Sequence, residues 1–332
     1  MADGYRIIGA EMSPYSVKLR SYFRYKGIPH QWVLRNAASQ AEFEKHAKIP
    51  VIPLVVTPEG TGMQDSTPII DAMEKLYPEP PVHPDDAVVR FISELIEEFG
   101  DEWGNKWMFH YRWARDVDQI SSAGRIARMR GPDAGEEAHA VFTEKVRKRM
   151  VDRVWFVGSN AANAPRIEAG FLEMLALLER HLTTRPYLFG DRPAFGDFGL
   201  WGQIYEMWTD PTAGALIGGG APHVLDWVHR MLWPRAEGAF ERWAALEPTL
   251  MPILAEQVGR LFLPWTAANE KAITEGKEEF SVTLGDHVWT QKPQKYHARS
   301  LGMLRAKYAA VPDKAALDPV LAAAGCLTGL QG

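Results

Sequence analysis

The first eighty residues constrain the fold most, because strand-like and helix-like segments alternate there in a definite order. The apolar run at residues 5–10 predicts a buried strand, and Pro14 stands at a favoured first position of a helix that ends near Gly27. The following segments continue the alternation: strands at 30–34, 54–56 and 61–64, and helices at 41–46 and from Ser66 onward. The order β-α-β-α-β-β-α predicts a mixed sheet flanked by helices.

The rest of the chain divides into a helical region and a tail. A proline-rich stretch at residues 77–81 is typical of a linker, and apolar residues then recur at helical spacing from residue 85 to about residue 259. In the tail, segments 280–284 and 287–290 are either two short strands or an extended wrap, and a final helix is predicted at 296–309. We therefore expect three units: residues 1–78, an all-helical domain at 85–262, and a C-terminal extension at 263–332.

The composition is that of an ordinary globular protein, with 46% hydrophobic and 24% charged residues. The net charge of −5 and the scattered basic residues argue against a nucleic-acid partner. The single cysteine, Cys326, excludes an intramolecular disulfide and favours a reducing compartment. Because the chain shows neither a basic leader segment nor an apolar run of about 18 residues, we expect a cytoplasmic protein without a membrane span. The histidines lack metal-site spacing, so no metal is expected.

Three short motifs in the first domain each have an ordinary structural interpretation. The Ser-Pro-Tyr-Ser sequence at residues 13–16 supplies a good N-cap for the first helix. Pro53 stands at the entrance of a strand, where most prolines are trans. The Gln-Asp-Ser sequence at residues 64–66 supplies a cap for another helix. Each motif alone is weak, and their order and spacing carry more information than any one of them.

Together these motifs resemble the glutathione-binding half of the glutathione S-transferase family. The resemblance implies a thioredoxin-like N-terminal domain followed by a helical-bundle domain, with glutathione as co-substrate. Serines replace both cysteines of the C-x-x-C motif of redox-active thioredoxin-like proteins, so disulfide exchange at this motif is excluded and the chain looks serine-type. The family is commonly dimeric, which implies a homodimer.

The resemblance gives the first motif a catalytic role. The hydroxyl of Ser13, at the positive end of a helix, would hold the glutathione thiolate. Tyr15 and Ser16 are alternatives, and Tyr15 especially could be the hydroxyl that reaches the sulfur. Lys18 and Arg20 complete the family pattern, with a plain solvated lysine as the alternative for Lys18.

The other two motifs would bind the rest of glutathione. In the family the proline at the position of Pro53 is cis, and the backbone of Ile52 would pair with the cysteinyl part of glutathione like an added strand. Pro50 is a competing match, but it would leave Pro53 inside a central strand. Four polar residues complete this predicted site: Ser66 for the γ-glutamyl carboxylate, Asp65 for the γ-glutamyl ammonium, and Lys48 and Gln64 for the glycyl carboxylate and backbone.

The 12 tryptophans suggest an apolar pocket lined by aromatic side chains. Trp103, Trp107 and Tyr111 share one face of a predicted helix, and Trp201 and Tyr205 form a similar stripe later. Plain core packing is the ordinary alternative for each of these residues.

The sequence therefore predicts a glutathione transferase that directs the glutathione thiolate at a small hydrophobic electrophile, a detoxification chemistry. The alternatives are a non-catalytic binding protein of the same fold and a specialised glutathione-dependent dehalogenase, isomerase or ether-cleaving enzyme. The tail would cover the active site, extend a dimer interface or pack as a third unit. The cluster of Arg125, Arg128 and Arg130 is predicted to be a solvated loop, with an anion site as the alternative. Gly218-Gly219-Gly220 is predicted to be a flexible loop.

Overall fold

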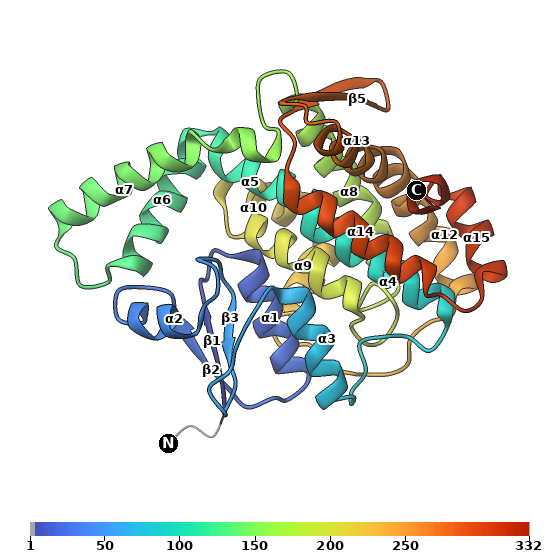
Figure 1. Ribbon diagram of the computed structural model, residues 1–332, viewed down its shortest axis with the longest axis horizontal. Helices are drawn as coiled ribbons and strands as arrows, with labels where there is room; N and C mark the ends of the chain where they lie inside the picture. The colour runs from blue at the N-terminus through green and yellow to red at the C-terminus, as the bar shows by residue number, and fades with distance from the viewer. Residues whose placement is uncertain (1–3, 332) are drawn as a thin grey trace.

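The computed structural model describes residues 4–331, and its N-terminal part is a small sheet with helices on both faces (Figure 1). The sheet is mixed and has the order β2-β1-β3-β4, with β1 parallel to β2 and antiparallel to β3. The element order confirms the predicted thioredoxin-like domain. Its elements are β1 (Tyr5–Gly9), α1 (Pro14–Tyr25), β2 (His30–Leu34), α2 (Gln40–His46), β3 (Leu54–Val56), β4 (Gly62–Gln64) and α3 (Ser66–Leu76).

Alternation along the strands sends neighbouring side chains to opposite faces of this sheet. Ile7 of β1 belongs to the main core, which it shares with Val17 of α1 and Ile69 of α3. The next residue, Ile8, packs in a separate cluster with Phe43 of α2. This period of two is the pattern of a strand buried on both faces. The sheet is therefore held between α1 and α3 on one side and α2 on the other.

The second part is almost entirely helical, as the apolar spacing predicted. In this region Gly218–220 is not a loop, because these glycines form the last turn of α10. The elements are α4 (Ala87–Phe99), π-helical η1 (Gly100–Gly104), α5 (Asn105–Ala114), α6 (Asp116–Arg130), α7 (Glu136–Val151), 3₁₀ turn η2 (Val154–Val157), α8 (Ala164–Leu182), α9 (Phe195–Trp208), α10 (Pro211–Gly220), α11 (Pro222–Arg230), α12 (Trp243–Ile253) and π-helical η3 (Leu254–Phe262). The α6–α7 hairpin projects from this body on the side of α2 (Figure 1).

Helix α9 starts at a buried carboxylate that joins three segments. Asp197 accepts the backbone N–H of Ala194 at 2.9 Å and that of Leu188 at 2.8 Å. It also accepts the indole N–H of Trp227 from α11 at 2.9 Å. Since Ala194 has no side-chain acceptor, the carboxylate caps the helix in one direction only. Burial raises the pKa of Asp197 to about 7.

The C-terminal extension packs along the helical body instead of standing apart from it. The two tail segments left open by the sequence are strands, paired as an antiparallel hairpin. Helix α14 runs beside α4 (Figure 1), where the rings of Phe91 and Tyr308 meet edge to face at 5.7 Å. The elements are α13 (Leu263–Thr274), β5 (Phe280–Leu284), β6 (His287–Gln291), α14 (Lys295–Ala309), α15 (Lys314–Ala323) and α16 (Leu327–Gln331). Within residues 4–331, no helix combines the length and apolar character needed to cross a bilayer.

A buried lysine ties this extension to α5. The Nζ of Lys106 lies 3.6 Å from the ring centre of Trp265 and 5.3 Å from that of Trp289, both in the extension. It also donates to the Gln291 side chain at 3.3 Å. Burial lowers the pKa of Lys106 well below its ordinary value, since water is excluded from the ammonium.

Candidate functional site

Ser13 lies in the turn between β1 and α1, and its hydroxyl has spare hydrogen-bonding capacity. Its Oγ accepts the backbone N–H of Ser16 at 3.3 Å, which is the expected N-cap contact. An accepting hydroxyl still has its own proton to donate. The residue is half-buried, so a ligand atom can reach it. Ser13 therefore caps the helix and keeps one donor at the helix N-terminus.

The turn that carries Ser13 is held by the helical domain. The guanidinium of Arg112 on α5 donates to the carbonyl of Met12 at 3.1 Å. The same guanidinium pairs with Asp210 and Glu206, both at 2.7 Å, and all three side chains are buried. Buried pairing with two carboxylates through different nitrogens fixes the direction of a guanidinium. Arg112 is thus a positioning residue for the Ser13 turn, and sequence reasoning missed it because its partners lie about a hundred positions away.

The two alternative hydroxyls are engaged elsewhere. Tyr15 donates its hydroxyl to the backbone carbonyl of Asp101 at 3.0 Å. Burial raises the pKa of Tyr15 well above its ordinary value. Ser16 is completely buried against β1. The packing there is so close that a Cβ atom added at Gly9 would lie 2.9 Å from the Oγ of Ser16. Of the three predicted hydroxyls, only Ser13 combines partial exposure with an uncommitted proton.

Lys18 is not a solvated lysine, because its side chain is fully buried between the two domains. Its ammonium donates to Glu97 at 2.5 Å and to Asp101 at 2.6 Å. Burial by itself would lower the pKa of Lys18, but the two carboxylates outweigh it and raise the pKa. Thr67, at the start of α3, also donates to Glu97 at 2.5 Å. This network fixes α1 and the first turn of α3 to α4.

The peptide bond between Ile52 and Pro53 is cis, which confirms that part of the prediction. Ile52 is half-buried and lies directly before β3. Gln64 of β4 does not face a free space, since its amide accepts the N–H of Lys48 at 2.7 Å and donates to the carbonyl of Val51 at 2.8 Å. Gln64 therefore positions the loop before Ile52, and the side chain of Lys48 is left exposed.

Asp65 and Ser66 form the start of α3, within the Gln-Asp-Ser sequence that was expected to cap it. The helix begins at Ser66, and Asp65 is its N-cap. Asp65 has a φ of 76°, in the left-handed region where a residue with a side chain is uncommon. Such backbone conformations cluster at binding sites. Ser66 is 2% exposed, and Pro68 in the first turn of α3 carries no N–H. The donors at this helix start are therefore the backbone N–H groups of Ser66 and Thr67 and the Ser66 hydroxyl.

The segments that carry these residues match known domains. Residues 7–81 match the family model of the glutathione S-transferase N-terminal domain, and residues 161–230 match that of the glutathione S-transferase C-terminal domain. The chain belongs to the glutathione S-transferase family. No protein of curated function matches its sequence.

Several solved structures align with the chain at low identity. A glutathione S-transferase from Methylobacterium radiotolerans, in complex with glutathione sulfonate, is 19% identical with a TM-score of 0.39, covering 72% of this chain and 98% of its own. One from Rhodospirillum rubrum is 15% identical with a TM-score of 0.42, covering 89% and 99%. The β-etherase LigF from Sphingobium sp. is 16% identical with a TM-score of 0.43, covering 69% and 94%. The family assignment depends on the two domain models alone.

Helix α14 of the extension forms one wall beside the start of α3. The hydroxyl of Tyr296 lies 3.5 Å from the Asp65 carboxylate. His297 contacts Glu102, and Ser300 donates to Glu98, so two acids of the α4–η1 segment pair with α14. The contact between Tyr296 and Asp65 therefore places part of the C-terminal extension next to the candidate site. Periodicity predicted the helix but not which surface it would cover.

The acids beneath α14 have strongly shifted pKa values. Burial and the nearby Glu102 raise the pKa of Glu98 to about 8. Burial and Glu97 likewise raise the pKa of Glu102 to about 8. Burial lowers the pKa of His297 to about 3, with a further contribution from Lys106. Each of these shifts favours the uncharged form, a neutral imidazole for His297 and a protonated carboxyl group for Glu98 and Glu102.

The predicted aromatic pocket is corrected by the structure, which gives these side chains a packing role. Trp103, Trp107 and Tyr111 are at most 2% exposed and lie edge to face or tilted against other core rings. Trp201 is 1% exposed and stacks on the partly exposed Tyr205 at 4.9 Å. None of the five lines a cavity among those described below. Helical spacing places residues on one face without saying whether that face meets protein or ligand.

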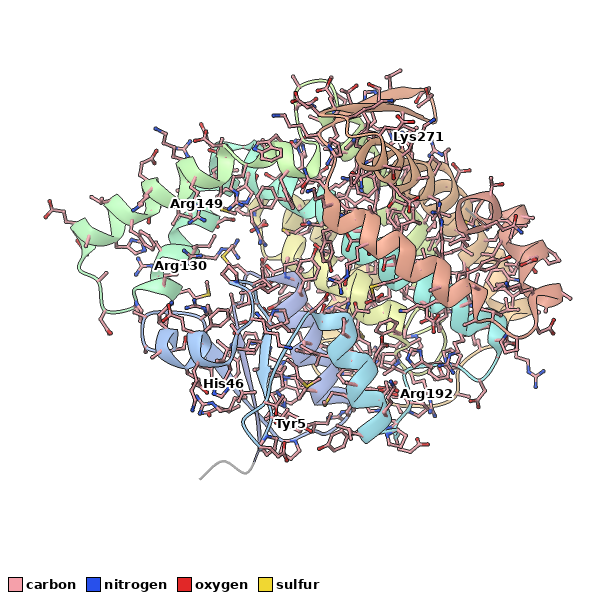
Figure 2. The ribbon with its side chains drawn as sticks, in the orientation of Figure 1. Tyr5, His46, Arg130, Arg149, Arg192 and Lys271 are labelled. Atoms are coloured by element: carbon pink, nitrogen blue, oxygen red, sulfur yellow. The ribbon has the colours of Figure 1, made fainter. Side chains whose placement is uncertain are left out.

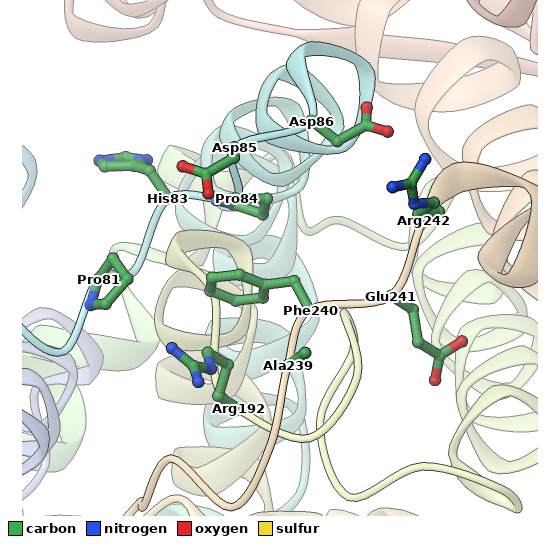
Figure 3. Close-up of a pocket in the computed structure, with 10 residues that line it drawn as sticks. All are labelled: Pro81, His83, Pro84, Asp85, Asp86, Arg192, Ala239, Phe240, Glu241 and Arg242. Atoms are coloured by element: carbon green, nitrogen blue, oxygen red, sulfur yellow. The ribbon is translucent and has the colours of Figure 1, made fainter.

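The largest described cavity, about 470 Å³, lies at the domain linker and not at Ser13 (Figure 3). Figure 3 shows Phe240 between the linker residues and Arg192. Asp86 caps α4, and Glu241 pairs with Arg185, so these charged groups have structural partners. The cavity lies at the start of α4, whose 13 residues separate it by roughly 20 Å from the acids that pair with Lys18. A cavity of about 310 Å³, in contrast, is lined by Ile52.

Proposed function

We propose that this chain is a serine-type glutathione transferase in which Ser13 stabilises the thiolate of glutathione. The observation that carries the proposal is the free proton of the Ser13 hydroxyl at the N-terminus of α1, on a turn held by Arg112. A donor at the positive end of a helix stabilises a thiolate and lowers the pKa of the thiol. The proposed co-substrate is glutathione, as in the solved relatives whose descriptions name glutathione or glutathione sulfonate as bound.

The remaining groups have binding roles in this proposal. Ser66 and the first N–H groups of α3 would take the γ-glutamyl carboxylate, and Asp65 the ammonium. The backbone of Ile52 would pair with the cysteinyl part of glutathione. Gln64, Lys18 and Arg112 act through the backbone segments that they hold.

The chemical step is a nucleophilic substitution or addition by sulfur. The glutathione thiol loses its proton to water, and the thiolate hydrogen-bonded to Ser13 forms the new S–C bond with an electrophilic carbon. In a substitution the leaving group departs with the electron pair of its broken bond. In an addition the π bond of the electrophile breaks, and its electron pair takes up a proton from water. The protein contributes orientation of the thiolate and stabilisation of its charge.

Titration of glutathione into the protein by calorimetry tests this proposal. We expect saturable binding to the wild type and binding about 10- to 100-fold weaker for Ser66→Ala, because a hydrogen bond to a charged group contributes about 1.5–3 kcal/mol. Ser281→Ala, at an exposed position of β5, is the control and should bind normally. Absence of binding to folded wild type, together with no turnover of any electrophile, would overturn the proposal in favour of a non-catalytic binding protein.

Two further properties belong to the same proposal. We expect a homodimer, which light scattering after size-exclusion chromatography measures directly. We also expect a cytoplasmic protein, since Cys326 is a buried free thiol, which suits a reducing compartment.

A further inference from the structure

Two tryptophans of the described residues are exposed, and their surroundings differ. Trp233, in the segment between α11 and α12, is 66% exposed, and Trp155 of η2 is 47% exposed. Of the two, only Trp233 lines a described cavity, an open hollow of about 410 Å³. An exposed indole offers a large apolar surface and one N–H donor to a partner.

The hollow lies where the end of α1 meets the segment after α11. It shares no lining residue with the cavity that Ile52 and Arg130 line. Because α1 has 12 residues, the hollow is roughly 18 Å from Ser13 at the other end of this helix. Figure 2 shows Arg192, which donates to the Gly238 carbonyl of the same segment, on the side of the molecule away from Arg130. Its lining residues are Arg24, Tyr25, Lys26, Gly27, Trp233, Pro234, Arg235 and Ala236.

The segment that carries Trp233 is held by hydrogen bonds on both sides of the indole. The guanidinium of Arg24 donates to the carbonyl of Leu232 at 2.8 Å. The backbone N–H of Arg235 donates to the hydroxyl of Tyr187 at 2.9 Å. The exposed ring is therefore presented from a fixed backbone, which lowers the entropy lost when a partner binds.

The polar side chains around the indole are cationic donors. The guanidinium carbon of Arg24 lies 4.0 Å from the ring centre of Trp233, so this cation covers one face of the ring. Arg235, which also lines the hollow, is exposed. Guanidinium groups and indole N–H groups donate hydrogen bonds and cannot accept them. A partner that satisfies them must therefore supply acceptor atoms.

The positive charge of the hollow is not neutralised by the protein. Within residues 4–331, no carboxylate forms an ion pair with Arg24 or Arg235. Three neighbouring carboxylates already pair with other cations: Glu11 with Arg20, Glu74 with Lys26, and Glu237 with Arg230. Two uncompensated guanidinium groups beside an exposed ring create a local positive potential, which favours an acidic partner.

The openness of the hollow favours a protein over a small molecule. Small-molecule sites bury most of the surface of their ligand, whereas Trp233 and Arg235 both lie at an exposed position. A protein partner brings its own surface to exclude water around such groups. Tryptophan and arginine are also the residue types that contribute most to the affinity of protein interfaces. The net charge of −5 disfavours a nucleic acid or an anionic membrane as the partner.

We propose that this hollow docks a carboxylate-rich segment of a partner protein. An apolar or aromatic side chain of that segment would pack on the free face of Trp233, and its carboxylates would meet Arg24 and Arg235. The hollow lies at the opposite end of α1 from Ser13, so this proposal does not depend on the proposed function.

Selection from a phage-displayed library of short random peptides tests the chemistry of the partner. The library is first depleted on Trp233→Ala and then selected on the wild type, so the retained peptides depend on the hollow. We expect these peptides to be enriched in aspartate and glutamate beside an aromatic residue. No retained peptide, or retained peptides no more acidic than the starting library, would overturn the proposal.

Calorimetric titration of a retained peptide then measures the roles of single residues. Its counterpart has asparagine and glutamine in place of aspartate and glutamate. We expect the wild type to bind the acidic peptide at least about tenfold tighter than this counterpart, and Arg235→Met to lose the preference. Trp233→Ala should weaken the acidic peptide at least about tenfold. An unchanged preference in folded Arg235→Met would contradict the carboxylate contact.

Two variants outside the hollow are matched controls. Arg128 is an exposed arginine of α6, the helix that contains the arginine cluster expected to be a loop, and Arg128→Met should keep the preference for the acidic peptide. Trp155 has Lys292 at 5.6 Å from its ring centre but does not line the hollow, so Trp155→Ala should bind as the wild type does. Near-ultraviolet circular dichroism checks that each variant is folded.

Two other occupants of the hollow are distinguished by direct measurement. Self-association of the wild type that is lost in Trp233→Ala, measured by light scattering, would assign the hollow to a second copy of the chain and overturn the proposal. Binding to phosphatidylserine vesicles that is lost in Trp233→Ala would assign it to a membrane surface and overturn it likewise.

Discussion

Replacing Ser13 by alanine separates two contributions of one hydroxyl. As an N-cap the hydroxyl accepts a backbone N–H at 3.3 Å, which is a long contact, so its loss should lower the free energy of unfolding by only about 0.5–1 kcal/mol. As a donor to a thiolate it should contribute about 1.5–3 kcal/mol, the range for hydrogen bonds to charged groups. The two effects differ in size and in the experiment that detects them.

The larger contribution appears in the pKa of bound glutathione. A loss of about 1.5–3 kcal/mol from the thiolate corresponds to a rise of roughly one to two pKa units. Below that pKa the thiolate fraction, and with it turnover, should fall about 10- to 100-fold. Ultraviolet difference absorbance of the thiolate against pH measures the shift. Affinity for glutathione should change little at a pH below the pKa of the bound thiol, where glutathione binds with its thiol protonated.

Ser16→Ala is the matched control for this experiment. Its hydroxyl is buried and has no hydrogen-bond partner within residues 4–331, so the thiol pKa should stay at the wild-type value. Ser13→Thr keeps a hydroxyl and should retain a lowered thiol pKa. A thiol pKa unchanged in Ser13→Ala would refute the reasoning and move the thiolate contact to backbone donors.

Three further changes test the network around the site. Lys18→Met leaves Glu97 and Asp101 buried without their counter-ion and should lower the free energy of unfolding by about 3–5 kcal/mol in denaturant titrations, while adding Glu97→Gln should restore part of it. Gln64→Ala should weaken glutathione binding with little change in melting temperature, because it releases the loop before Ile52. Binding that is unchanged in a folded Gln64→Ala variant would contradict the positioning role. Glu98 has a pKa of about 8 when folded against 4.5 ordinarily, so its stabilising contribution is present below pH 4.5 and is lost as pH rises to 8. Glu98→Gln should remove this part of the decline in the free energy of unfolding. Parallel pH profiles of that free energy for the wild type and Glu98→Gln would instead show that Glu98 titrates with its ordinary pKa.

Local patterns in the sequence were enough for most of the secondary structure. Pro14 at the first position of α1 and the run of residues at 30–34 predicted elements that the structure places within about a residue, because helix starts and buried strands depend on nearby residues. The glycines of α10 were misjudged, since helix neighbours outweighed their weak propensity. The Arg125–Arg130 cluster was misjudged for another reason: closeness in sequence suggested one loop, whereas its members lie on helix α6 and point to different surroundings.

The sequence by itself determined the order of elements and the place of Ser13 as a hydroxyl at a helix start, because each depends on residues adjacent in the chain. The cis bond at Pro53 was implied by the resemblance to the family and not by the neighbouring residues. Only the tertiary structure decided which side chains face solvent, core or cavity. Lys18 became a buried ion-pair centre, Trp103 a core residue and Arg130 the wall of a cavity through contacts with segments far away in sequence. Local patterns specify the direction of a helix face, but what meets that face is set by packing across the whole chain.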